Sequence, residues 1–102
     1  MAVNTVAKPQ QRHRFPIGRL TMTHAVDHLI KQGRLDPAPY IARHHKGDWG
    51  DLSDHDWAAN DRALRSGDDR LFSSYEVAPD LTLYIITEWD RSVTTLMLPS
   101  DY

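Results

Sequence analysis

The spacing of apolar residues changes once along this chain, near Gly67. Before that glycine, apolar residues recur every three or four positions, as they do on one face of a helix. From residue 70 to residue 98 they alternate with polar residues, as in strands that bury one face. Helices followed by strands predict an α+β fold, with two to three N-terminal helices packed on a three- or four-stranded antiparallel meander.

Each predicted helix lies between a residue type that caps a helix start and a glycine near its end. Pro37 suits a first helical turn, and Ser53 with Asp56 has the spacing of a capping box. The predicted helices run from Thr21 or Thr23 to Gly33, from Asp36 to the GDWG turn at residues 47–50, and from Ser53 to Gly67.

Four segments have the composition of strands. The predicted strands are Arg14–Leu20, Arg70–Val77, Leu81–Glu88 and Arg91–Leu98. Pro16 lacks an N–H donor, which places the first of them at a sheet edge. Apolar residues on both faces of Leu81–Glu88 predict that this is the central strand.

The 102 residues are enough for one modest core, so we expect a single domain at 14–102 after a flexible basic arm at 1–13. Residues 1–19 hold four of the twelve basic residues and none of the fourteen acidic ones. A basic arm on an acidic body contacts phosphates or an acidic partner, or is simply a solvated terminus. Arg12 and Arg14 are the candidate contacts of this arm.

The chain has no cysteine, which excludes disulfides, thiolate metal sites and a cysteine nucleophile. No apolar run approaches the roughly 18 residues of a membrane span, and the first residues lack the apolar stretch of a secretory signal. We therefore expect a cytoplasmic protein with no membrane partner.

No cofactor or metal is predicted. Phosphate-cradling motifs are absent, because Gly47 and Gly50 do not form G-x-G-x-x-G and no G-K-[ST] occurs. His24 and His28 have the spacing of zinc proteases, but Ala25 stands where the glutamate base would be. The remaining candidate ligands, which match no standard metal-site spacing, are His44, His45, Asp48 and His55.

Metal-independent ribonuclease chemistry is one hypothesis, because histidine shuttles protons and arginine grips phosphate. The candidate side chains are His44 or His45, Arg70, Ser74, Tyr75 and Thr87. In the structural alternative, Arg70 is a charge at a strand edge, Ser74 is an exposed strand residue and Tyr75 belongs to the core.

Three tryptophans are many for a chain of this length. Trp57 is expected in the core, on the inner face of its helix. Trp49 and Trp89 lie in predicted turns, where an indole either covers the core edge or is an exposed anchor for a partner. The core-edge interpretation is favoured for both; if both are exposed, they form a recognition patch with Tyr84.

The segments HHKGDWGDL, DWAANDRAL, RLFSSYEV, LYIITEWDRSVTTLMLP and SDY resemble short bacterial proteins encoded on plasmids and integrative elements. The similarity spans about residues 14–102, and His44 occupies the histidine of its H-x-x-G-D-W-G motif. It implies a bacterial, cytosolic accessory protein of a mobile element, and it supplies no reaction. The pattern points to His44, Gly47, Asp48, Trp49, Asn60, Arg70, Ser74, Tyr75, Thr87 and Tyr102.

A buried polar network that joins the GDWG turn to the sheet would explain these residues structurally. The leading functional hypothesis is a cytosolic accessory protein that binds another macromolecule, either protein or nucleic acid. Its contacts would be Asp48, Trp49, Trp89, Arg12 and Arg14. The alternative is a metal-independent, toxin-like ribonuclease that uses His44, Arg70, Ser74 and Tyr75.

Overall fold

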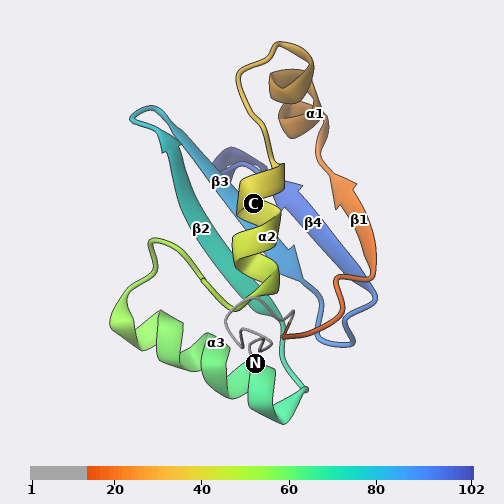
Figure 1. Cartoon of the computed structure of the whole chain (residues 1–102), viewed down its shortest axis with the longest axis vertical. Coiled ribbons are helices and arrows are strands. Elements are labelled where there is room, and N and C mark those ends of the chain that lie inside the picture. Colours follow the sequence, from red (N-terminus) through yellow and green to blue (C-terminus); the bar gives the residue numbers. More distant parts are fainter. Residues whose placement is uncertain (1–13) are drawn as a thin grey trace, which may run out of the picture.

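The computed structural model describes residues 14–102, so the predicted arm at 1–13, with Arg12, lies outside the described residues. The elements in chain order are β1 (Arg19–Met22), α1 (His24–Lys31), α2 (Ala38–His45), α3 (Asp54–Ser66), β2 (Leu71–Ala78), β3 (Leu81–Thr87), β4 (Val93–Met97) and the short 3-10 helix η3 (Pro99–Asp101). The α+β class is confirmed. Figure 1 shows α2 lying across one face of the sheet, with α3 beside the lower part of β2 and α1 above β1.

The four strands form one sheet in the order β1-β4-β3-β2. β2, β3 and β4 pair antiparallel, and β3 is an inner strand, as the sequence predicts. The prediction of an entirely antiparallel sheet is wrong, because β1 precedes the helices and pairs parallel with β4. Sequence patterns locate strands but do not identify the strands they pair with. Three helices separate β1 from the other strands, so the connection allows either a parallel or an antiparallel pairing.

The first strand also begins later than predicted, at Arg19, so Pro16 lies ahead of it. Thr21 belongs to β1, and Thr23 is the N-cap of α1, with its hydroxyl accepting a hydrogen bond from Val26 N at 3.3 Å. α2 begins at Ala38 with Pro37 as its N-cap, one position later than predicted, whereas the signals of α3 hold. Ser53 Oγ accepts from Asp56 N at 3.2 Å, and Gly67 ends α3 at a φ of +71°.

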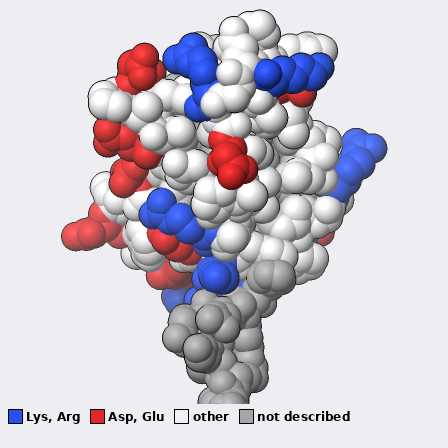
Figure 2. All heavy atoms as spheres, turned by 45° about the horizontal axis from the view of Figure 1, so that its top comes forward, with Lys and Arg blue, Asp and Glu red and all other residues white. Residues whose placement is uncertain are grey.

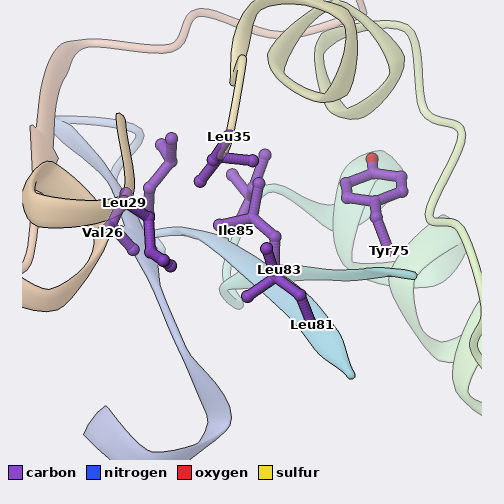
Figure 3. Packing of buried hydrophobic residues seen from close by; sticks show 8 residues of the cluster. Val26, Leu29, Leu35, Tyr75, Leu81, Leu83 and Ile85 are labelled. Atoms are coloured by element: carbon purple, nitrogen blue, oxygen red, sulfur yellow. The ribbon is translucent and has the colours of Figure 1, made fainter. Parts of the chain in front are cut away.

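The main core lies between α1, the segment that follows it, and one face of the sheet. Figure 3 shows Val26 and Leu29 of α1 directed toward Leu83 and Ile85 of β3, with Leu35 above them. The alternation predicted for β2 and β3 is confirmed, since Leu71, Ser73 and Tyr75 are buried, as are Leu81, Leu83 and Ile85.

A second, smaller cluster lies beneath the turn between α2 and α3. It consists of Phe15, Trp49, Ala63 and Leu71, with Trp57 partly buried against it. Trp49 is completely buried, so the core position favoured from the sequence is confirmed for this tryptophan. Its indole N–H donates to Asp61 Oδ1 at 2.9 Å, which satisfies the one polar group that it carries.

The outer edge of β2 is closed by hydrogen bonds from the helical half of the chain. The Asn60 side-chain amide of α3 makes the two hydrogen bonds that a neighbouring strand would make. Phe72 N donates to Asn60 Oδ1 at 3.0 Å, and Asn60 Nδ2 donates to Phe72 O at 2.6 Å. Ser74 N then donates to Trp49 O at 3.2 Å, and Ser74 O accepts from Asp51 N at 2.7 Å. This edge therefore offers little to a further strand.

Replacing Asn60 by Ala should lower the free energy of unfolding by about 1–3 kcal/mol, because both outward backbone groups of Phe72 lose their partner. Arg62→Ala, at an exposed position of the same helix, should change it by less than about 0.5 kcal/mol. Urea unfolding followed by circular dichroism measures both. Equal stability of the two variants would contradict this account of the edge.

Candidate functional site

His44 is the centre of a buried polar network. Its ring is fully buried, with Nδ1 at 2.6 Å from Ser73 Oγ and Nε2 at 2.9 Å from Thr87 Oγ1. Thr87 Oγ1 is also 2.7 Å from Thr94 Oγ1, and Thr94 Oγ1 donates to the carbonyl of Ile17 at 2.7 Å.

The Ile17 carbonyl determines which group donates in every hydrogen bond of this network. A carbonyl can only accept, so the single Thr94 hydroxyl proton points to Ile17, and Thr87 must donate to Thr94. Thr87 Oγ1 then accepts from His44 Nε2–H, which leaves Nδ1 to accept from the Ser73 hydroxyl. The network is complete with a neutral histidine in one tautomer.

Burial lowers the pKa of His44 from 6.5 to about 3, and the positive charge of nearby His45 adds to the effect. The imidazole is therefore neutral near neutral pH and does not exchange a proton with solvent there. This is the state that the hydrogen-bond directions require. His44 acts as a structural cross-link between α2 and the sheet.

The GDWG turn contacts the sheet beside this network. The Tyr75 hydroxyl donates to Asp48 O at 2.6 Å, and Gly50 forms a bridge with Ser74. Gly50 has a φ of +78°, and a Cβ on it would lie 2.1 Å from Ser74 O, so only glycine fits. The predicted contact of the turn with the sheet is confirmed, but the buried network around His44 joins α2, and not the turn, to the sheet.

The four residues of the ribonuclease hypothesis do not meet in one accessible site. His44 and Tyr75 are buried on the helix-covered face of the sheet, and burial raises the pKa of Tyr75 well above its usual value. Ser74, the neighbour of Tyr75, points to the opposite face, and Arg70 is exposed before β2 begins. The serine that contacts His44 is Ser73, which the sequence interpretation did not select.

The candidate binding residues also separate into two groups. Trp49 is buried, and Asp48 is held by Arg43, whose Nε donates to Oδ2 at 2.7 Å, so neither presents a free contact. Trp89, by contrast, is 60% exposed in the turn between β3 and β4, and the Arg14 side chain is exposed. The core-edge interpretation is thus right for Trp49 and wrong for Trp89.

A pocket of about 360 Å³ opens between α3 and the face of the sheet opposite to the main core. α3 contributes Asp56, Ala59 and Ala63 to its lining. The sheet contributes Phe72 and Tyr84, and Arg70 and Tyr102 stand at its rim. Among the residues that the resemblance singles out, Asn60, Arg70 and Tyr102 meet here.

Three aromatic rings form the wall of this pocket. The Phe72 and Tyr84 ring centroids are 4.8 Å apart at an interplanar angle of 69°, an edge-to-face contact. The Tyr102 ring lies 6.3 Å from Phe72 and 6.2 Å from Tyr84. Arg70 Nη2 donates to the Tyr102 hydroxyl, and the guanidinium carbon is 5.4 Å from the Tyr102 ring centroid. Within residues 14–102, no ion pair engages Arg70.

Sequence reasoning missed Phe72 as a site residue and named Tyr84 only as an addition to an exposed tryptophan patch. The available signal was an aromatic residue in each strand at a position that faces away from the main core, where polar residues are usual. In the structure both rings are half-buried, because they pack against each other in the aromatic wall of the pocket.

Arg91 is a second residue that the sequence did not point to. It is the one described residue other than glycine with a positive φ, at 60°, and its guanidinium donates to four carbonyls. The accepting carbonyls are those of Ala63, Asp69, Glu88 and Trp89. Arg91 therefore fixes the Trp89 turn beside Asp69, which lines the aromatic pocket.

Within the described part of the chain, no three His, Cys, Asp or Glu side chains are grouped so that they could hold a metal ion. The described helices include none with the length and apolarity needed to span a membrane. Comparison of the chain with protein-family models, with curated proteins and with solved structures found no match. The resemblance to mobile-element proteins therefore stays a prediction.

The buried histidine predicts an acid-sensitive fold. Below pH 6.5 the unfolded chain protonates His44, whereas the folded chain keeps it neutral down to about pH 3. Unfolding then takes up a proton, so this residue lowers the stability by up to about 1.4 kcal/mol per pH unit as the pH falls through that window.

Urea unfolding of the wild type and of His44→Gln, from about pH 7 to about pH 4, measures this effect. Glutamine does not titrate, so the wild-type stability should fall more steeply, and its advantage over the variant should shrink with acid. Parallel profiles would show that His44 does not remain neutral in the fold.

Proposed function

We propose that this chain is a small accessory protein that acts by binding another protein, through the aromatic pocket and the neighbouring Trp89. The observation that carries the proposal is the pocket itself, with its three-ring wall and an arginine whose guanidinium forms no ion pair within the described residues. The polar residues of the interior, such as His44, stabilise the fold instead. Every buried side-chain polar atom in residues 14–102 has a hydrogen-bond partner, so the interior groups are committed to the fold.

The composition of the pocket suits a protein partner. Tyrosine, tryptophan and arginine are the residue types that dominate binding energy at protein interfaces. Ala59 and Ala63 leave room for an apolar or aromatic side chain against Phe72 and Tyr84. The Arg70 guanidinium at the rim can then take a carboxylate of the same segment in a bidentate contact.

A nucleic-acid partner is less favoured by the charge distribution. On the face drawn in Figure 2, Lys and Arg side chains lie in separate groups between acidic side chains. Residues 20–102 hold all fourteen acidic residues of the chain, and Asp56 and Asp69 line the pocket. Non-specific nucleic-acid affinity comes mainly from neutralising phosphates, which this surface does poorly.

The proposal extends to where the protein acts. The absence of cysteine fits a reducing compartment, so we place the protein in the cytoplasm. An accessory role in a bacterial mobile element is what the sequence resemblance implies, and a binding protein without chemistry of its own suits that role.

Filling the pocket should abolish partner binding. Ala59→Arg places a long charged side chain in the pocket, whereas Ala58→Arg puts the same side chain at the exposed neighbouring position of α3. A partner captured from cells that carry the gene should be retained by Ala58→Arg and lost by Ala59→Arg. With the isolated partner, calorimetry should show at least a tenfold rise in Kd, about 1.4 kcal/mol.

Both arginine variants should keep the wild-type melting temperature within a few degrees, which separates a blocked pocket from a lost fold. Equal binding by the two variants would remove the pocket from the proposal. Cleavage of RNA by the pure protein in EDTA, lost in Arg70→Ala, would instead favour the ribonuclease alternative.

Trp89 should contribute to the same interaction without supporting the fold. Trp89→Ala removes a ring that is 60% exposed, so the free energy of unfolding should change by less than about 0.5 kcal/mol. Partner affinity should fall by about tenfold to a hundredfold, as for an interface anchor. Full affinity in this variant would confine the binding surface to the pocket.

A further inference from the structure

The two edges of the sheet differ in one respect that matters for assembly. The β2 edge is closed by Asn60 and by the segment Trp49–Asp51. At the other edge, β1 is the outermost strand, and Figure 1 shows no described element beyond it.

Half of the backbone groups of β1 point away from the sheet. Arg19 N donates to Ser92 O at 2.9 Å and Thr23 N donates to Leu96 O at 3.1 Å, so the odd-numbered residues face β4. Alternation along the strand directs the N–H and C=O groups of Leu20 and Met22 outward. No group of residues 14–102 bonds to them across that edge.

The side chains do not protect this edge. Leu20 is 42% exposed and Met22 is 38% exposed, and both lie on the face of the sheet that carries Thr94 and Leu96. A proline, a bulge or an inward-pointing charge usually protects an edge strand against pairing with another strand. β1 has none of these between Arg19 and Met22.

We propose that the β1 edge binds the β1 edge of a second copy of this chain, antiparallel about a twofold axis at Thr21. In that register Leu20 lies opposite Met22 of the other copy, and each such pair exchanges both backbone hydrogen bonds. The exposed apolar side chains of Leu20 and Met22 then cover each other. The two sheets become one continuous sheet.

Charge complementarity supports the second copy as the occupant. The same register sets Arg19 opposite Thr23 of the other copy, on the same face of the sheet. Thr23 Oγ1 donates to Asp101 Oδ2 at 2.8 Å, so the Asp101 carboxylate is held beside the position that Arg19 would reach. In residues 14–102 Arg19 has no ion-pair partner, and the twofold axis creates this contact twice.

Hydrogen bonds from Leu98 N and Thr23 lower the pKa of Asp101, so the carboxylate is charged at neutral pH. The shared edge is short, because β1 has four residues. An interface of this size lies at the low end of specific interfaces, and we expect a reversible dimer that forms at high protein concentration.

A charge-swap experiment tests this arrangement. Sedimentation velocity on the full chain, from about 10 µM to about 1 mM, should show a monomer–dimer equilibrium. Arg19→Glu alone should raise the dimer Kd at least about tenfold, because each contact becomes a repulsion between Glu and Asp101. Asp101→Lys alone should do the same, through repulsion between the introduced lysine and Arg19.

An equimolar mixture of the two single variants should recover the dimer, because a mixed pair restores opposite charges at both contacts. Arg62→Glu is the matched control, since it makes the same charge change on α3, at the other edge of the sheet, and should leave the wild-type Kd unchanged. Failure of the mixture to recover the dimer would overturn the proposed register.

Amide hydrogen exchange by NMR gives a second readout that does not depend on the Asp101 variant folding. The Leu20 and Met22 amides should become protected as concentration rises, and Met22→Arg, which crowds charges at the axis, should abolish this protection. A wild-type protein that stays monomeric at about 1 mM, with both amides exchanging freely, would overturn the proposal.

Discussion

The contact between Gly50 and Ser74 holds the helical half of the chain to the sheet, and most of the other packing depends on it. The bridge sets Trp49 over Leu71 and brings Asp51 against the edge of β2. It requires a glycine, because a Cβ at this position would overlap the Ser74 carbonyl. With the turn fixed there, α2 packs on the sheet with His44 between Ser73 and Thr87. α3 then runs along the β2 edge, where Asn60 bonds to Phe72.

This arrangement explains why side chains with catalytic chemistry lie in the interior. A histidine bonded to a serine hydroxyl occurs in catalytic triads, but here its second ring nitrogen contacts a threonine hydroxyl rather than a carboxylate, and the Ile17 carbonyl orders the protons along the whole network. A fully satisfied buried network rigidifies one packing arrangement and is costly to disturb. The polar residues of the interior thus specify how α2 docks, and the surface chemistry remains at Arg70, Tyr102 and Trp89.

The sequence predicts local structure well where a local signal exists. Thr23, Ser53 and Gly67 act at the helix ends as their residue types imply, and the predicted alternation holds from Leu71 to Tyr75 in β2 and from Leu81 to Ile85 in β3. The partner of β1 was not predictable, because its pairing with β4 joins segments about seventy positions apart. Trp49 and Trp89 both lie in turns, so only the tertiary contacts with Phe15 and Arg91 distinguish the buried ring from the exposed one. The pocket was equally hidden, since its wall combines β2, β3 and the last residue of the chain.

The position of the pocket connects the two surfaces that we assign. It lies between α3 and the β2–β3 side of the sheet, whereas β1 forms the opposite edge. Pairing of two copies through β1 therefore leaves both pockets open and places them at the two ends of one continuous sheet. A dimer of this kind would engage a repeated or dimeric partner at two points, and the second contact would then form at a high effective concentration. Weak association through a short edge is sufficient for this, because a bivalent partner stabilises the dimer as it binds.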